Sequence, residues 1–300
     1  MTSEPTRCGY VTFLGATNAG KSTLLNHMVG SKVSIVTHKV QTTRALIRGI
    51  GMHDETQIIY VDTPGIFDPR RRLDRAMIKT AWSGTQDADV VCLLVDAKRG
   101  FTEAIGEILE RLKTIKQPKL LVLNKIDLVP REELLALTNK VNDICKFDET
   151  FMVSALNGDG VSDLMKNLCG RMPLGPWLYP EDQASDLPMR QLAAEITREK
   201  LFLRLHEELP YASTVETEAW KTLKDGSARV EQTIYVQRDS QKKIVIGKAG
   251  QTIRGISSDA RHEMAEIYGQ KIHLFLFVKV RENWIDDPER YREIGIDFAK

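Results

Sequence analysis

The sequence has few cysteines, and no two of them lie close together. Its four cysteines, Cys8, Cys92, Cys145 and Cys169, are widely separated, and no C-x-x-C pair occurs. This spacing argues against a zinc site built from paired cysteines and is typical of reduced, buried thiols in a cytosolic protein. The six histidines are scattered as well, so the sequence predicts no zinc site.

The chain also lacks long apolar runs and a strong net charge. Apolar stretches such as 90–95 are far too short to span a bilayer, and the short polar segment 1–7 does not resemble a signal peptide. A formal net charge of +1, with 42% hydrophobic and 28% charged residues, is typical of a soluble globular protein. We therefore expect a cytoplasmic location, with which peripheral contact on the inner membrane is compatible. A chain of 300 residues is long enough for two domains.

A glycine-framed segment at residues 15–22 is the most informative feature that is present. It fits the pattern G-x-x-x-x-G-K-[ST], follows an apolar run at 10–14 and precedes a stretch of helical periodicity. A strand, a loop and a helix in this order are the context of a phosphate-binding loop. We predict that Lys21 reaches the β- and γ-phosphates of a nucleotide and that Ser22 ligates Mg²⁺. The predicted phosphate-binding residues are Gly15, Ala16, Thr17, Asn18, Ala19, Gly20, Lys21, Ser22 and Thr23.

Two further motifs stand at the ends of apolar runs that we predict to be strands. D-T-P-G occupies 62–65, and its Asp62 can hold Mg²⁺ through a water molecule. N-K-I-D occupies 124–127, and the carboxylate of Asp127 can accept hydrogen bonds from guanine N1–H and N2–H₂. Adenine lacks these donors, so GTP and GDP are favoured over adenine nucleotides. The predicted switch II residues are Asp62, Thr63, Pro64, Gly65 and Ile66, and the predicted guanine-binding residues are Asn124, Lys125, Asp127, Ser154, Ala155 and Leu156.

The polar segment 37–44 lies between the first predicted helix and the next strand. A threonine hydroxyl here can complete the Mg²⁺ shell when a γ-phosphate is present. We predict switch I at Gln41, Thr42 and Thr43, and we choose Thr43 as the metal ligand beside Ser22 and Asp62. The alternative interpretation is an ordinary solvated loop, which would have the same polar composition.

The residue after D-T-P-G indicates how hydrolysis differs here. Ras-like enzymes place a water-orienting Gln at this position, but this chain has Ile66. The side chain of Asn18, with carbonyls of the switch loop, can instead hold a monovalent cation such as K⁺ against the phosphates. We expect slow intrinsic turnover, on the order of 10⁻⁴ to 10⁻² s⁻¹.

A second glycine-framed loop, G-K-A-G, stands at residues 247–250. Between 238 and 281 the chain has nine Lys and Arg residues against four acids, an excess that the net charge hides. KH modules use such a loop to clamp about four nucleotides of single-stranded RNA. Local propensity favours a strand at 244–246, whereas the KH pattern makes it a short helix, and we follow the KH pattern. The predicted RNA-binding residues are Lys242, Lys243, Gly247, Lys248, Ala249, Gly250 and Arg254. The alternative is a pair of helix-capping glycines beside an ordinary charged face.

Alternating strands and helices up to about residue 170 indicate a mostly parallel sheet with helices on both faces. Four prolines punctuate 172–188, and an α+β pattern follows. These patterns predict an α/β P-loop domain followed by a smaller α+β domain. The family resemblance described next implies that the first is a GTPase domain of the Ras-like kind and the second a KH domain of type II. The predicted boundaries are 6–171 for the GTP-binding domain, 172–189 for a linker, 190–287 for the KH domain and 288–300 for a C-terminal tail.

From about residue 8 to residue 287 the chain resembles the bacterial Era family of GTPases. The motifs that carry the resemblance are G-A-T-N-A-G-K-S-T from Gly15, Q-T-T-R from Gln41, D-T-P-G from Asp62, N-K-I-D from Asn124, Y-P-E-D from Tyr179, R-E-K-L from Arg198, E-L-P-Y from Glu208 and Q-K-K-I-V-I-G-K-A-G from Gln241. The resemblance implies a GTP- and Mg²⁺-dependent switch that binds the 3′ end of small-subunit ribosomal RNA and assists maturation of the 30S subunit. It also implies peripheral association with the cytoplasmic membrane, and it does not suggest DNA as a partner.

Two departures from the family pattern concern loop chemistry. Ala16 and Thr17 replace the usual Arg-Pro pair, and Lys248 and Ala249 vary the inner pair of the KH loop.

Two other functions also fit the sequence. One is a switch whose KH fold docks onto a protein or a membrane, and the other is a GTPase that acts on transfer RNA or on the large ribosomal subunit.

Overall fold

The computed structural model describes residues 5–69, 71–206 and 209–282, together with Trp284, Tyr291, Gly295 and Ile296. The chain divides into two compact units. The first contains the residues up to Ser34, Thr43–Asp186 and, of the described C-terminal residues, Gly295 and Ile296, whereas the second contains Ile35–Thr42 and Leu187–Glu293. The segment Ile35–Thr42 therefore belongs with the second unit, although it lies early in the sequence. The predicted domain boundaries, including the 172–189 linker, stay a prediction.

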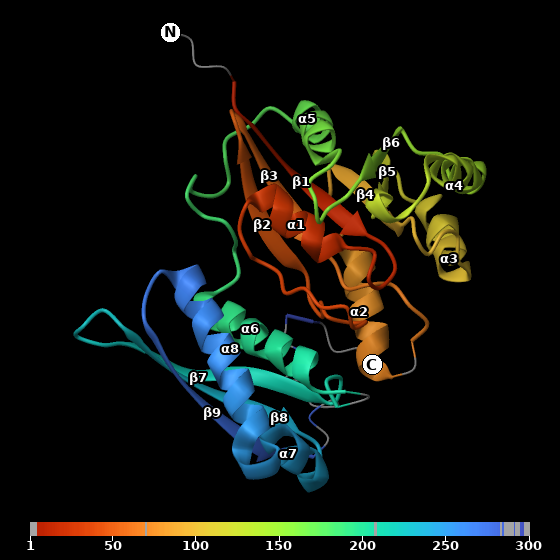
Figure 1. The fold of residues 1–300 in the computed structure, drawn as a ribbon. Coiled ribbons are helices and arrows are strands. Elements are labelled where there is room, and N and C mark those ends of the chain that lie inside the picture. Colours follow the sequence, from red (N-terminus) through yellow and green to blue (C-terminus); the bar gives the residue numbers. More distant parts are fainter. Residues whose placement is uncertain are drawn as a thin grey trace. The chain divides into compact units, whose positions relative to one another are not determined.

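The first unit is built on a six-stranded sheet with the strand order β2-β3-β1-β4-β5-β6 (Figure 1). Its strands are β1 (Arg7–Leu14), β2 (Ile47–His53), β3 (Thr56–Asp62), β4 (Val90–Asp96), β5 (Lys119–Asn124) and β6 (Glu149–Val153). Its helices are α1 (Lys21–Val29), α2 (Arg72–Ser83), α3 (Glu103–Leu112), η1 (Ile126–Leu128), α4 (Arg131–Ile144) and α5 (Val161–Arg171). β2 runs antiparallel to β3, and all other pairs are parallel. The predicted mostly parallel sheet is thus confirmed.

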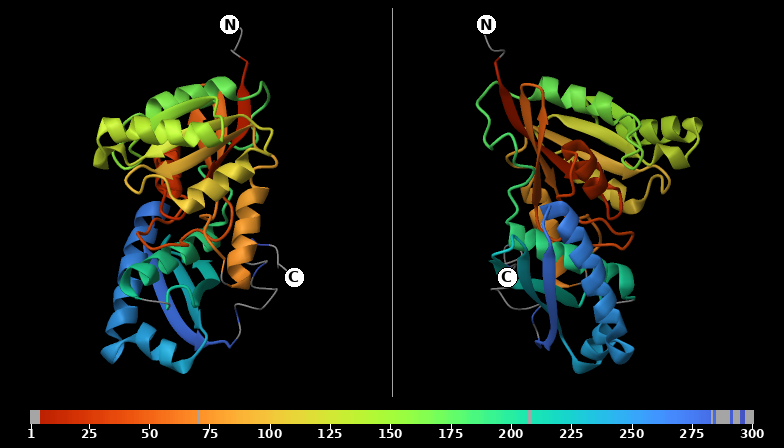
Figure 2. Two further views of the ribbon diagram at one scale, coloured as in Figure 1. Left: turned by 90° about the vertical axis from the view of Figure 1, so that its right-hand side faces the viewer. Right: turned by 60° about the vertical axis from the view of Figure 1, so that its left-hand side comes forward.

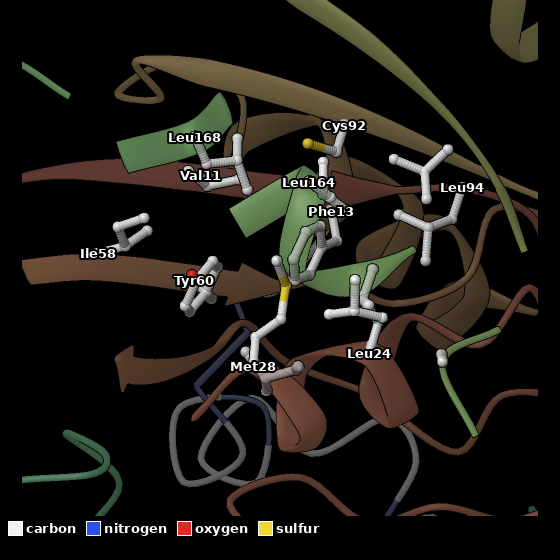
Figure 3. Close-up of a cluster of buried hydrophobic side chains, with 14 of the residues drawn as sticks. Val11, Phe13, Leu24, Met28, Ile58, Tyr60, Cys92, Leu94, Leu164 and Leu168 are labelled. Atoms are coloured by element: carbon white, nitrogen blue, oxygen red, sulfur yellow. The ribbon is translucent and has the colours of Figure 1, made fainter. Parts of the chain in front are cut away.

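Helices cover both faces of this sheet, which is the reason that its central strands are apolar throughout (Figure 2). On one face, α1 and α5 pack on the strands, and Figure 3 shows the side chains between them, including Phe13 stacked on Tyr60. On the other face lie α2, α3 and α4. Because both faces are covered, polar functional groups gather at the carboxyl ends of the strands.

One glutamine ties the proline-rich stretch after α5 to this unit. Gln57 on β3 is fully buried, and its Oε1 accepts hydrogen bonds from the backbone N–H groups of Leu178 (2.8 Å) and Tyr179 (3.0 Å). Its Nε2 donates to the Tyr179 carbonyl at 2.8 Å. The stretch is therefore held along β3 by a side chain that satisfies three backbone groups.

The second unit has a three-stranded sheet with the order β7-β8-β9, in which β8 pairs antiparallel with β7 and parallel with β9. Its elements are α6 (Met189–Arg204), β7 (Ser213–Thr222), β8 (Ala228–Val236), α7 (Asp239–Ile246), η2 (Lys248–Gly250), α8 (Gln251–Tyr268) and β9 (Ile272–Val280). Apolar residues of α6 and α8 pack on one face of this sheet. Residues 244–246 are helical, as the KH pattern predicts.

Two sequence predictions reach beyond the described residues. The sequence also indicates a helix over about 190–208; it corresponds to α6, which ends at Arg204, and Glu207 and Glu208 lie outside the described residues, as does most of the predicted tail 288–300. Among the helices that the structure describes, none is long and apolar enough to cross a membrane.

We expect the substitution Gln57→Leu to lower the free energy of unfolding by about 1–3 kcal/mol, because the backbone groups of Leu178 and Tyr179 lose their partner. Urea unfolding of the full chain measures this change. The matched control is Gln86→Leu, since Gln86 is exposed and should change stability by less than about 0.5 kcal/mol. Equal unfolding midpoints for the two variants would contradict the role of Gln57.

Candidate functional site

The loop between β1 and α1 has the backbone of a phosphate cradle. Gly15, Asn18 and Gly20 all have positive φ angles of 152°, 63° and 94°, and α1 begins at Lys21. These conformations turn backbone N–H groups toward one concave point at the positive end of the helix. This backbone is suited to a phosphate, and the assignment of residues 15–23 to phosphate binding stays a prediction.

Lys21 is held inside this loop. Its side chain is buried, and Nζ donates to the carbonyls of Gly15 (3.1 Å) and Ala16 (3.0 Å). Burial lowers the pKa of Lys21 to about 8, and the nearby carboxylate of Asp62 opposes this shift. A phosphate at the loop would stabilise the charged ammonium in the same way.

A single buried amide joins the phosphate loop to the predicted guanine-binding loops. Asn124 Nδ2 donates to the Ala19 carbonyl at 2.8 Å, and its Oδ1 accepts from the N–H groups of Lys125 (2.8 Å) and Ala155 (2.9 Å). Gly20 leaves room for this amide, because a Cβ there would lie 2.1 Å from Asn124 Nδ2. Three loops that are distant in sequence are thereby fixed to one side chain.

The other predicted guanine-binding residues differ in their contacts and exposure. Lys125 has a left-handed backbone (φ 67°), and its Nζ donates to the Asn18 carbonyl at 2.8 Å and to Asp96 Oδ2 at 2.6 Å. Asp127 in η1 and Leu156 are exposed, whereas Ser154 is buried. The exposed carboxylate of Asp127 is available to a base. Asp96 was not predicted from the sequence, although its position at the end of a buried strand was a signal.

The predicted metal ligands converge on the carboxylate of Asp62. Asp62 is fully buried, and its Oδ2 accepts hydrogen bonds from Ser22 Oγ (2.6 Å) and Thr43 Oγ1 (3.3 Å). The two hydroxyls are 3.1 Å apart. Asp62 Oδ1 has no hydrogen-bond partner within the described residues. A cluster of hydroxyl and carboxylate oxygens with one unpaired buried oxygen fits a hard cation such as Mg²⁺.

Thr42 and Thr43 have different surroundings. Thr43 is buried beside Ser22 and Asp62, whereas Thr42 Oγ1 lies 2.7 Å from Thr37 Oγ1 and donates to the Lys39 carbonyl. The geometry supports Thr43 as the metal ligand. Gln41, the first predicted switch I residue, has a left-handed backbone with φ 58°.

A further residue at this cluster escaped the sequence analysis. Ser34 is fully buried and donates from Oγ to Asp62 Oδ2 at 2.9 Å. Asn26 on α1 holds this turn, since its Oδ1 accepts from the N–H groups of Val33 and Ser34 and its Nδ2 donates to the Ser34 carbonyl. Ser34 can orient Asp62 without being a metal ligand itself.

The predicted switch II residues run from this cluster along the phosphate loop. Thr63 Oγ1 donates to the Phe13 carbonyl at 2.7 Å, and the N–H of Ile66 donates to the Gly15 carbonyl at 3.1 Å. A Cβ on Gly65 would lie 2.8 Å from Thr17 Cα, so glycine permits this close approach. Ile66 is buried and aliphatic, and its side chain cannot orient a water molecule.

The predicted RNA clamp lies between α7 and α8. Gly247 and Gly250 both have φ 74°, Ala249 has φ 51°, and Lys243, Lys248 and Ala249 are exposed. Beside the loop, a groove of about 560 Å³ is lined by residues that include Gly250, Arg254, Arg261, His273 and Phe275. Cationic and aromatic side chains in one groove are suited to the phosphates and bases of a single strand.

Two family models match this chain: a 50S ribosome-binding GTPase model over residues 10–125 and a KH domain model over residues 208–285. The chain is 65% identical to the GTPase Era of Sinorhizobium medicae, over 99% of this chain and 96% of that protein. It is 64% identical to the GTPase Era of Afipia carboxidovorans, over 99% and 97%, and 64% identical to that of Brucella suis, over 98% and 94%.

Two solved structures are also similar over almost the full length of the chain. One is Era in complex with MgGDPNP and nucleotides 1506–1542 of 16S ribosomal RNA, with a TM-score of 0.92, 36% identity and coverage of 97% of this chain and 99% of that one. The other is a variant of Aquifex aeolicus Era bound to GDP and aluminium fluoride, with the same score, identity and coverage.

We expect Gly20→Ala to weaken binding of Mg·GDP by at least about tenfold, because the new methyl group displaces the Asn124 amide and its bonds to two loops. Fluorescence titration with a labelled GDP measures the affinity. Gly30→Ala is the matched control, since Gly30 also has a positive φ (75°) but nothing lies within 4 Å of its Cβ position. If both variants bind GDP equally, the steric role of Gly20 is wrong.

Proposed function

The chain belongs to the Era family of GTPases, and from this premise we propose that it is a nucleotide-controlled switch in assembly of the 30S ribosomal subunit. In this function it binds and hydrolyses GTP, with Mg²⁺ as cofactor, and its KH domain binds the 3′ end of small-subunit ribosomal RNA. The observation that carries the proposal is that one chain holds both a GTPase site around Asp62 and a G-x-x-G loop beside a basic groove.

The loop residues 15–23 bind the phosphates through backbone N–H groups, and Lys21 neutralises their charge. Asp127 accepts hydrogen bonds from the guanine base, and the Asn124 amide keeps the guanine-binding loops in register with the phosphate loop. Ser22, Thr43 and Asp62, the last through water, hold Mg²⁺, which when bound neutralises charge that develops on the β- and γ-phosphates. Ser34 keeps the Asp62 carboxylate oriented toward this site.

Hydrolysis proceeds without a water-orienting side chain at Ile66. Asn18, which stands at the left-handed turn of the phosphate loop, supplies a side-chain carbonyl for a monovalent cation beside the phosphates. A cation held there by Asn18 would supply positive charge beside the phosphates, as an arginine finger does. The intrinsic rate of GTP hydrolysis stays low because the chain itself supplies only some of the groups that stabilise the transition state.

We predict that GTP turnover is at least about tenfold faster in KCl than in NaCl at equal ionic strength, because the larger ion fits a site made of carbonyl oxygens. Steady-state phosphate release measures the rate. In Asn18→Gly, a change that the positive φ tolerates, the rate in KCl should fall to that in NaCl. Equal wild-type rates in the two salts would count against the cation site.

The GTP-bound form favours RNA, and hydrolysis releases or resets the complex. The glycines of the loop let the backbone approach about four nucleotides closely, while Lys242, Lys243, Lys248 and Arg254 contact phosphates. We propose a cytoplasmic location for this activity, with peripheral contact on the membrane as a second property of the chain.

We expect Gly250→Asp to weaken binding of a single-stranded RNA copied from the 3′ end of small-subunit ribosomal RNA by at least about tenfold, because a carboxylate faces the phosphates. Nothing lies within 4 Å of a Cβ at Gly250 or at Gly269, which has the same left-handed backbone at the far end of α8. Gly269→Asp is therefore the matched control and should bind as the wild type does.

Fluorescence anisotropy measures this RNA affinity with a non-hydrolysable GTP analogue and with GDP. Tighter wild-type binding in the GTP-analogue state supports the switch. Equal and weak binding in both states would instead favour a KH fold that docks onto a protein or a membrane.

A further inference from the structure

Helix α6 carries two charged side chains that are almost completely buried. Arg198 is 1% exposed and Glu199 is 2% exposed. Burial of a charge is costly unless well-placed partners compensate it. These residues begin the R-E-K-L motif, to which neither the GTPase site nor the RNA clamp assigns a role. Their partners therefore indicate what the motif does.

Both side chains bind the segment Ile35–Thr42, which belongs with α6 in the second unit. Glu199 Oε1 accepts a hydrogen bond from the backbone N–H of Val36 at 2.8 Å. Arg198 Nη2 donates to the backbone carbonyl of Thr42. The segment forms neither helix nor strand. Helix α6 thus supplies charged partners for its backbone near both ends.

A third contact holds the middle of the segment. Lys39 Nζ donates to the carbonyls of Phe202 and Leu205 at the C-terminal end of α6. The last carbonyls of a helix have no partner within the helix and carry the negative end of its dipole, so a lysine is well suited to this position. The segment is therefore bound to α6 at three points.

Helix α6 is also connected to α8, the helix that follows the G-K-A-G loop in the second unit. Glu199 pairs with Lys200 at 2.8 Å, and Lys200 pairs with Glu263 on α8. Farther along, Arg204 Nε donates to Asp259 on α8 at 3.0 Å. Because α8 begins directly after the G-K-A-G loop, these ion pairs connect the segment 35–42 to the helix that presents the clamp.

We propose that Arg198, Glu199 and the C-terminal carbonyls of α6 form a receptor for the segment Ile35–Thr42, through which the RNA-binding unit detects the bound nucleotide. The proposal rests on the proposed function and names the residues that regulate it. The residue that follows the segment is Thr43, which bonds to Ser22 and Asp62 at the GTPase site. A γ-phosphate that changes the position of Thr43 therefore acts directly on a peptide that α6 holds. By linkage, RNA at the clamp changes nucleotide affinity by the same factor.

The first test measures amide hydrogen exchange of α6 in the full chain, with GDP and with a GTP analogue, and uses no RNA. In the wild type we expect exchange of the α6 amides to differ at least about threefold between the two nucleotides. Lys39→Met removes one contact from the segment side, and Arg198→Lys keeps the charge but changes the donor geometry. Both should reduce the difference to less than about half.

The matched control is Lys224→Met, since Lys224 is an exposed lysine in the turn between β7 and β8. It should behave as the wild type does. The receptor is wrong if α6 exchanges equally in both nucleotide states of the wild type, or if the difference persists in Lys39→Met and Arg198→Lys.

The second test measures the ratio of RNA affinities in the GTP-analogue and GDP states. We expect Lys39→Met and Arg198→Lys to lower this ratio by about fivefold or more, toward one, while GTP turnover without RNA stays within about twofold of the wild type. A wild-type ratio of one would contradict the proposed function, whereas the RNA-free exchange measurement decides the receptor separately.

Discussion

The interaction on which the GTPase site depends is the acceptance of three hydroxyl hydrogen bonds by one buried carboxylate oxygen, Asp62 Oδ2. Ser22 in the phosphate loop donates one of these bonds. Ser34 and Thr43, which flank the segment 35–42, donate the other two. Burial raises the pKa of Asp62, while Lys21 and the three hydroxyls oppose that shift. The hydroxyls therefore help to keep the carboxylate ionised, as the proposed Mg²⁺ site requires.

Because Ser34 is anchored to α1 through Asn26, the beginning of the switch region is held independently of Thr43. Asn26 follows Ser22 by one helical turn, so the helix that starts at the phosphate loop also fixes this anchor. In the proposed switch, the stretch that responds to the nucleotide therefore lies between the Ser34 anchor and Thr43, at residues 35–42. The charged residues of α6 bind that stretch. This proposed role accounts for buried charges at positions where apolar residues would avoid the free-energy cost of desolvation.

The elements that could be predicted from the sequence are those that depend on neighbouring residues. The phosphate loop depends on consecutive residues with fixed backbone requirements, and the alternation of apolar runs is enough to indicate a mostly parallel sheet with helices on both faces. The secondary structure of residues 244–246 was harder to predict, because three β-branched side chains favour a strand. These residues form the last turn of α7, ending at Gly247, since the apolar Val245 packs into the core there.

The residues that were not predicted from the sequence all make contacts with residues far away along the chain. Asp96 pairs with Lys125, Ser34 with Asp62, and Glu199 with Val36, across separations of 29, 28 and 163 residues. A local pattern can mark one member, as the end of a strand marks Asp96, but it does not identify the partner, because the two residues are far apart in the sequence. The sequence by itself determined the nucleotide class, the two glycine-framed loops and the fold class, since these follow from short motifs and periodicity. Only the tertiary structure decided which oxygens surround Asp62 and which unit holds the segment 35–42, because desolvation makes a polar contact strong only once folding has buried both partners.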